Sequence, residues 1–160
     1  MFKRIVRNQI VAMVKNLSVY CNKKYGIDKK SIHSLIKELK TILNFEIRIF
    51  EINFITSEDI ININTQYLGH KNSTDIITFN YSGENNNFDG EIYISLEDAL
   101  ENSKKFKVSF DNEIIRLVIH GVLHMLGYDD IKATDKKKMK VLENSLVARF
   151  KNKFSKVVIK

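Results

Sequence analysis

The chain has 160 residues, of which 44% are apolar and 28% charged, and its formal net charge is +7. These fractions are typical of a globular protein and argue against a disordered chain, and the length favours a single domain over residues 1–160. The one cysteine, Cys21, excludes an intramolecular disulfide framework and a four-cysteine zinc site, and it is typical of a reducing compartment. Any metal would therefore be held by His, Asp or Glu.

The N-terminal region is basic and has no Asp or Glu before residue 28, which is typical of transit peptides and also of a lysine- and asparagine-rich composition. The apolar run Ile10 to Val14 is too short for the core of a secretory leader, which needs about 7–15 residues. The longest uncharged apolar stretch, Leu117 to Tyr128, falls short of the roughly 20 residues that cross a membrane. We expect a cytoplasmic protein without a membrane partner.

Hydrophobic periodicity and capping residues divide the rest of the chain into short elements. In chain order, the sequence predicts a loop or turn at 17–30, a helix capped by Ser31 and running to Leu43, a strand at 46–55, a helix from Ser57 to about Tyr67, strands at 74–81 and 89–95, a helix at 96–106, a helix at 111–126, and a last helix capped by Thr134.

The two strands 74–81 and 89–95 are separated by an asparagine-rich loop, so we expect them to pair. The segment 111–126 is apolar nearly all round, which predicts a buried central helix. The fold class is therefore α+β: a small mixed sheet covered by several helices, with a buried central helix that binds metal.

The basic charge is concentrated near the C-terminus. Residues 131–160 carry nine lysines and one arginine against Asp135 and Glu143. Such a segment attracts polyanions such as RNA in a salt-dependent way, although a solvated helix face with a lysine-rich tail has the same composition.

Two histidines lie in the predicted central helix. His120 and His124 are four residues apart, the spacing at which a helix offers two imidazoles to one zinc ion. Gly127 stands where the helix is expected to end, and the returning chain brings Asp130 toward the same face. Three protein ligands would leave one position for a water, as in catalytic zinc sites. We predict one Zn²⁺ per chain, with another divalent metal as the alternative.

A purely structural role for the two histidines is the competing interpretation. Each would then need a hydrogen-bond partner in an apolar helix, because an unsatisfied buried polar group costs roughly 1–3 kcal/mol. The spacing through Asp130 also matches the skeleton of zinc proteases, but these carry Glu after the first His, where this chain has Gly121. The usual peptidase base is therefore missing, and a glycine inside a helix suggests close packing.

Three sequence blocks resemble those of the YbeY family, metal-dependent endoribonucleases and rRNA maturation factors of bacteria. Residues 120–129 (HGVLHMLGYD) match the family signature, and residues 74–79 (TDIITF) with Asn64 and Tyr67, and 90–95 (GEIYIS), are similar to two further blocks in the same order. The resemblance implies hydrolysis of single-stranded RNA by a metal-activated water. It also implies maturation of the 3′ end of small-subunit rRNA, ribosome quality control, and the small ribosomal subunit as partner.

The chain departs from the family pattern at two positions. Asp130 replaces the last metal-ligating histidine, which adds a negative charge and shifts the preference toward harder metals. Leu68 stands where many members carry an arginine suited to RNA phosphate, so His70 or Lys71 is the candidate RNA contact. His70 is equally well interpreted as a surface loop residue.

The general base and the oligomeric state are not predicted. Asp129 is a candidate base by position, but a role in capping the turn is favoured, and we expect Thr74 and Asp75 to bond backbone at the start of a strand. Two other functions stay open: a non-catalytic ribosome-assembly or RNA-binding factor, and a zinc hydrolase acting on peptides.

Overall fold

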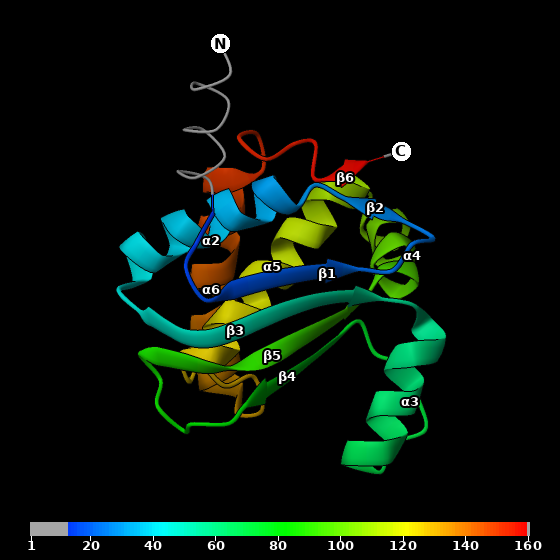
Figure 1. Cartoon of the computed structure of the whole chain (residues 1–160), viewed down its shortest axis with the longest axis horizontal. Coiled ribbons are helices and arrows are strands. Elements are labelled where there is room, and N and C mark those ends of the chain that lie inside the picture. The colour runs from blue at the N-terminus through cyan, green and yellow to red at the C-terminus, as the bar shows by residue number, and fades with distance from the viewer. Residues whose placement is uncertain (1–12, 160) are drawn as a thin grey trace.

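The computed structural model describes residues 13–159 (Figure 1). Its centre is a four-stranded mixed sheet in the order β1-β3-β5-β4. Strands β1 (Leu17–Cys21), β3 (Glu46–Ile55) and β5 (Asn87–Ser95) run parallel, and β4 (Ile76–Asn80) pairs antiparallel with β5. The predicted pairing of the strands at 74–81 and 89–95 is thereby confirmed. Strands β2 (Gly26–Ile27) and β6 (Val158–Ile159) form a separate antiparallel pair.

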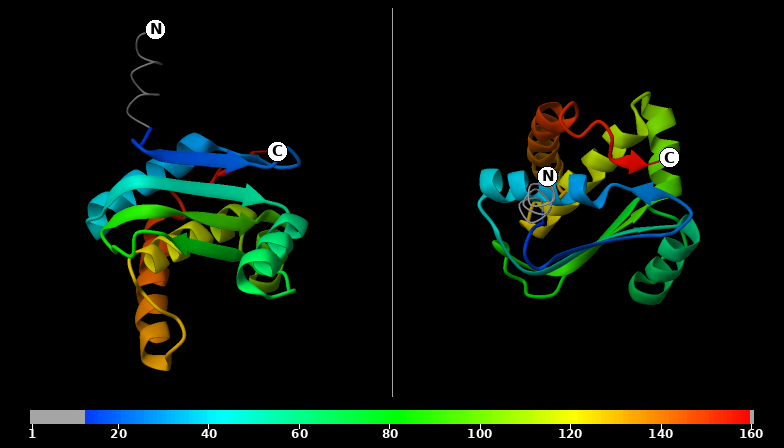
Figure 2. Two further views of the ribbon diagram at one scale, coloured as in Figure 1. Left: turned by 60° about the horizontal axis from the view of Figure 1, so that its bottom comes forward. Right: turned by 45° about the horizontal axis from the view of Figure 1, so that its top comes forward.

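Five helices complete the described part of the fold. They are α2 (Lys29–Leu43), α3 (Ser57–Leu68), α4 (Leu96–Phe106), α5 (Phe110–Met125) and α6 (Ala133–Phe150). Helices α2, α5 and α6 lie on one face of the sheet, as the right view of Figure 2 shows. The predicted α+β class, a small mixed sheet covered by helices, is confirmed.

Helix α5 is the central buried helix that the sequence predicts. Ten of its residues are buried, and they lie on all sides of the helix. Gly121 explains how closely α5 approaches the sheet, because a Cβ atom at this position would lie 2.5 Å from Cδ1 of Ile92 on β5. The helix is therefore held against the strands at the level of its two histidines.

The prediction of a loop over residues 17–30 is wrong. The segment contains β1, β2 and the start of α2. In β1, Leu17 and Val19 face the core while Ser18 and Tyr20 are more exposed, an alternation hidden by the polar residues that follow. Pairing with β3 then places this short strand at the edge of the sheet.

Two predicted caps are also misplaced. Helix α2 begins at Lys29 after Asp28, and Ser31, inside the first turn, donates a hydrogen bond of 2.7 Å to the Asp28 carboxylate. Helix α6 begins after Lys132, so Thr134 is its second residue rather than its cap. In both cases the helix starts earlier than its hydroxyl residue suggests, because the first turn needs no side-chain cap to form.

Among the described residues, no helix is long and apolar enough to span a membrane. The basic N-terminal stretch and most of the apolar run from Ile10 lie outside the described residues, so the expectations for a leader or transit segment stay expectations.

Candidate functional site

The last turns of α5 bring His120 and His124 together. Their Nε2 atoms lie 3.0 Å apart, and the ring planes are nearly perpendicular. Both side chains are partly exposed at the same end of the helix. The predicted placement of two imidazoles on one helix face is therefore what the fold shows.

A tight turn returns the chain to these histidines. Gly127 has φ +96°, a conformation that glycine adopts without steric cost, and the Tyr128 N–H bonds back to the Leu123 carbonyl at 3.0 Å. The turn places Asp130 Oδ2 3.7 Å from His120 Nε2 and 3.5 Å from His124 Nε2. The sequence expectation that Asp130 approaches both histidines agrees with this geometry.

Asp129 has a different task from its neighbour. Its Oδ1 accepts a hydrogen bond of 2.9 Å from the Ile131 N–H. The carboxylate therefore stabilises the turn, in line with the structural interpretation of this residue.

The second ring nitrogen of each histidine is already bound. His120 Nδ1 lies 2.6 Å from Glu143 Oε1, and His124 Nδ1 lies 3.1 Å from the Tyr128 carbonyl. Since carboxylate and carbonyl oxygens only accept, Nδ1 donates in both rings. In a neutral imidazole the other nitrogen, Nε2, then carries a lone pair. Two nitrogen lone pairs and one carboxylate oxygen thus converge on one point.

Three converging acceptors of this kind form a group that can hold a cation. The three ligand atoms lie within 4.8 Å of one another, with the separations of 3.0, 3.5 and 3.7 Å given above. For zinc bonds of about 2.0–2.2 Å, tetrahedral ligands stand roughly 3.3–3.6 Å apart. The residues present therefore fit a tetrahedral metal with one further position.

Glu143 supports this group from α6. It is 1% exposed, and its second carboxylate oxygen lies 3.2 Å from Lys140 Nζ and 3.7 Å from the Arg116 guanidinium. Burial by itself would raise the pKa of Glu143, but the hydrogen bond from His120 and the neighbouring positive charges outweigh it, so the pKa lies below its usual value. The carboxylate stays ionised and holds His120 by Nδ1, the arrangement that orients metal-ligating histidines.

Arg116 extends the support into a buried ionic network. Its guanidinium binds both oxygens of Glu113, at 2.5 and 2.8 Å, and lies 3.7 Å from Asp75. Asp75 also accepts from Asn102 at 3.0 Å, and burial, only partly offset by Arg116, raises its pKa. The expectation that the Asp75 side chain bonds backbone is wrong, because it points toward Arg116 and not along its own strand. Thr74 does bond backbone, at 3.4 Å to Ile76 O.

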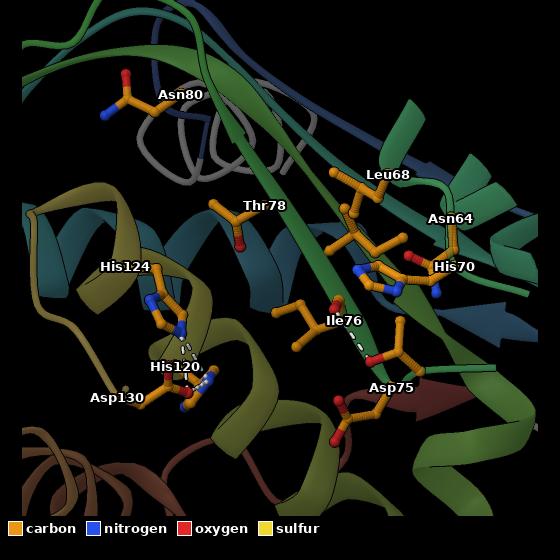
Figure 3. Close-up of a pocket in the computed structure, with 12 residues that line it drawn as sticks. Asn64, Leu68, His70, Asp75, Ile76, Thr78, Asn80, His120, His124 and Asp130 are labelled. Atoms are coloured by element: carbon orange, nitrogen blue, oxygen red, sulfur yellow. Dashed lines mark hydrogen bonds and ion pairs between the residues drawn. The ribbon is translucent and has the colours of Figure 1, made fainter. Parts of the chain in front are cut away.

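A cavity of about 600 Å³ opens beside the three candidate ligands (Figure 3). Its far end holds His70 and Leu68, so the structure brings His70 to the same cavity as the candidate metal group. Lys71 is exposed and does not line it. The described residues that line the cavity are Asn64, Leu68, His70, Thr74, Asp75, Ile76, Ile77, Thr78, Asn80, His120, His124 and Asp130.

Comparison with known proteins gives this site its context. The family model described as Endoribonuclease YbeY matches residues 18–151, which includes every residue of the site. The chain belongs to the YbeY family. It is thus a member of a family of RNA-cleaving hydrolases, and the resemblance inferred from the three sequence blocks is confirmed.

Individual YbeY relatives agree with the family match. A curated Endoribonuclease YbeY of Karelsulcia muelleri is 44% identical over 65% of this chain and 74% of its own. One of Phocaeicola vulgatus is 34% identical over 76% of this chain and 88% of its own. A solution structure from Thermotoga maritima covers 87% of this chain and 91% of its own, with a TM-score of 0.64 and 24% identity, and it supports the fold.

The sequence did not predict the residues that hold the histidines of the candidate site in place. Glu143 stands four residues after Met139 and three before Leu146, on the buried face of α6. An acidic residue within an apolar helix face signals a buried partner. Arg116 and Glu113 give the same signal three residues apart in α5, whereas the partnership with Asp75 depends on the fold alone.

Proposed function

We propose that the chain is a single-strand-specific metallo-endoribonuclease that cleaves RNA with a metal-activated water. The ligands are His120, His124 and Asp130, and the expected ion is one Zn²⁺ per chain. The observation that carries the proposal is the convergence of two Nε2 lone pairs and a carboxylate oxygen beside a cavity. A bound divalent ion supplies Lewis acidity to a phosphodiester and lowers the pKa of a coordinated water to about 7.

The chain's own residues orient the site. Glu143 and the Tyr128 carbonyl fix the two imidazoles through Nδ1, which keeps each Nε2 directed at the same point. Polar side chains of the cavity, including Asn64, Thr78 and Asn80, offer hydrogen bonds to ribose and phosphate. His70, at the far end, is the proposed RNA contact, with Lys71 beside it at the surface.

The packing at Gly121 supports RNA rather than peptide hydrolysis. Zinc proteases need a glutamate after the first ligand, but position 121 faces the sheet, with Ile92 and Ile76 in contact distance of any added Cβ. A carboxylate there would be buried against apolar side chains and could not reach a water in the cavity.

We further propose the biological setting that the family resemblance implies. The protein, acting as a single domain over residues 1–160, would process the 3′ end of small-subunit rRNA and take part in ribosome quality control in the cytoplasm. The small ribosomal subunit would be its partner. The basic composition of residues 131–160 supports a polyanionic target.

The decisive experiment measures metal content and RNA cleavage together. Wild-type protein supplied with zinc should hold about one ion per chain by mass spectrometry and cleave a single-stranded oligoribonucleotide until a chelator is added. The Asp130→Ala variant should lose most of the metal and the activity. Asp129→Asn is a matched control, because its amide oxygen can still cap the turn.

Two results would contradict the proposal. A wild-type protein that stays metal-free after zinc is supplied would overturn the metal site. Cleavage that persists in excess chelator would overturn the metal-dependent mechanism.

A further inference from the structure

A second groove, which shares no lining residue with the cavity already described, lies at the turn that carries Asp130. It has a volume of about 550 Å³ and lies between Tyr128 and one face of α6. Thr134, Lys137, Lys138, Val141 and Leu142 form the helical wall. Tyr128 is 38% exposed and Val141 is 64% exposed. The groove therefore offers an aromatic and an aliphatic residue that are both accessible to a ligand.

Both walls of this groove are joined directly to the candidate metal group. Tyr128 precedes Asp130 by two residues, and its carbonyl accepts the hydrogen bond from His124. Leu142 is the chain neighbour of Glu143, which holds His120. The groove and the candidate metal group are therefore built on the same two segments, the turn after α5 and helix α6.

The cavity at the metal group and the groove are lined by side chains of opposite charge. No lysine or arginine is among the described residues that line the cavity at the metal group, while Asp75 and Asp130 are. The groove has two lysines and no carboxylate in its lining, and the structure of residues 13–159 records no ion pair for either lysine. The positive charge that an RNA backbone needs is thus found in the groove.

We propose that this groove is a subsite for one nucleotide of single-stranded RNA flanking the cleaved bond. The base stacks on the Tyr128 ring against Val141 and Leu142, and Lys137 and Lys138 bind the adjoining phosphates. Aromatic side chains combined with a basic rim are the usual means of holding unpaired nucleotides, and a base within a duplex could not stack in this way. The inference rests on the proposed function, since it names how the same substrate is held.

Helix α6 is suited to this task by its position. In the left view of Figure 2 its N-terminal half, in orange, extends beyond the sheet. Lys132, Lys136, Lys137 and Lys138 are exposed on or beside this half, with Asp135 as the acidic residue among them. An RNA strand leaving the metal group on this side would meet several exposed lysines.

The test compares three variants by binding and by cleavage. Tyr128→Leu removes the ring and keeps apolar volume, Lys137→Ala with Lys138→Ala removes the rim charges, and Lys151→Ala with Lys156→Ala removes the same charge from exposed positions outside the groove. Binding of a fluorescein-labelled single-stranded oligoribonucleotide is followed by anisotropy in the cold with the metal-loaded protein, before cleavage proceeds. Metal content is measured on every sample.

The subsite predicts a specific pattern of effects. Tyr128→Leu should weaken binding by about 5- to 150-fold, the range typical of losing one stacked base. The Lys137/Lys138 double variant should lower the slope of log affinity against log salt by about 1.4, or roughly 0.7 for each phosphate contact. Both should raise KM more than they lower kcat, with metal content unchanged, and Lys151/Lys156 should stay near wild type.

Other outcomes distinguish failure of the nucleotide subsite from failure of the proposed ribonuclease function. If Tyr128→Leu and the Lys137/Lys138 variant bind RNA like wild type while wild type cleaves it, the groove is not a nucleotide subsite. If wild type binds RNA through the groove without cleaving it, the subsite stands and the ribonuclease proposal fails.

Discussion

Helices α5 and α6 are joined by the His120–Glu143 hydrogen bond and the Arg116–Glu143 ion pair, and they differ in character. Ten of the 16 residues of α5 are buried, against four of the 18 residues of α6. Helix α5 is fixed by packing against the sheet and therefore carries the side chains that must be placed most precisely. Helix α6 contributes three core residues (Met139, Leu146 and Phe150) and one buried carboxylate, and most of its other residues, including its lysines, are exposed. Helix α5 thus positions the histidines, and helix α6 supplies the positive charge that attracts RNA.

The largest expected effect comes from the ligands on α5. His120→Ala or His124→Ala should lose stoichiometric metal and reduce cleavage by about 10²–10³-fold or more, since a Lewis acid stabilises the transition state by several kcal/mol. Metal content by mass spectrometry and initial cleavage rates measure both losses. His33→Asn, a buried histidine outside the site, should keep its metal. Full metal content in either ligand variant would refute the assignment.

A smaller effect is expected from Glu143, the buried carboxylate of α6. Glu143→Gln can still accept from His120 Nδ1 but removes the charge, so metal affinity should fall about 10- to 100-fold, as for other residues that orient metal-bound histidines. Competition with a zinc-sensitive dye measures the affinity. Glu101→Gln, the same change on the exposed face of α4, should leave it unaltered. An unchanged affinity in Glu143→Gln would show that α6 does not support the metal group.

The turn between the two helices should be sensitive to any added side chain. Gly127→Ala forces a side chain into positive φ and places its Cβ 2.7 Å from Asn85 Nδ2. We expect a loss of about 1–2 kcal/mol in the free energy of unfolding, together with weaker metal binding through displaced Asp130. Gly83→Ala is the matched control, since it has φ +69° with no atom within 4 Å of the added Cβ. Urea titration compares the two, and equal losses would show that close packing at Gly127 adds nothing.

The smallest expected effect is on the pH dependence of the free energy of unfolding, and it arises from His33, which lies outside the candidate metal site. Burial lowers the pKa of His33, whose Nδ1 accepts a hydrogen bond of 3.0 Å from the Val14 N–H. The unfolded chain takes up this proton near pH 6.5 and the folded chain only at lower pH, so the free energy of unfolding should fall as the pH drops below about 6.5. In metal-free protein, His33→Asn should make this fall shallower. An identical pH profile for the two proteins would contradict the assignment.

The contrast between α5 and α6 also explains what the sequence could predict. The candidate ligands His120, His124 and Asp130 follow one another along a helix and its turn, so local spacing is enough to bring them together. Glu143 reaches the site from a helix that begins after the turn, and Asp75 reaches Arg116 from the residue just before β4. Such contacts depend on how elements pack, which spacing alone does not contain. For the same reason β1 was missed, because only its pairing with β3 distinguishes it from a loop.

The order of strands in the sheet has a consequence for how the chain folds. The β4–β5 pair closes a short loop, for example between Asn80 and Gly90, whereas the parallel pairs join Leu17 to Phe50 and Glu46 to Asn87 across long connections. Because closing a long connection costs more entropy, we expect the hairpin to form early and the parallel strands to be added later. Strand β1 lies at the sheet edge with β3 as its neighbour among the described residues, so its amides should exchange with solvent sooner than those of β3 and β5.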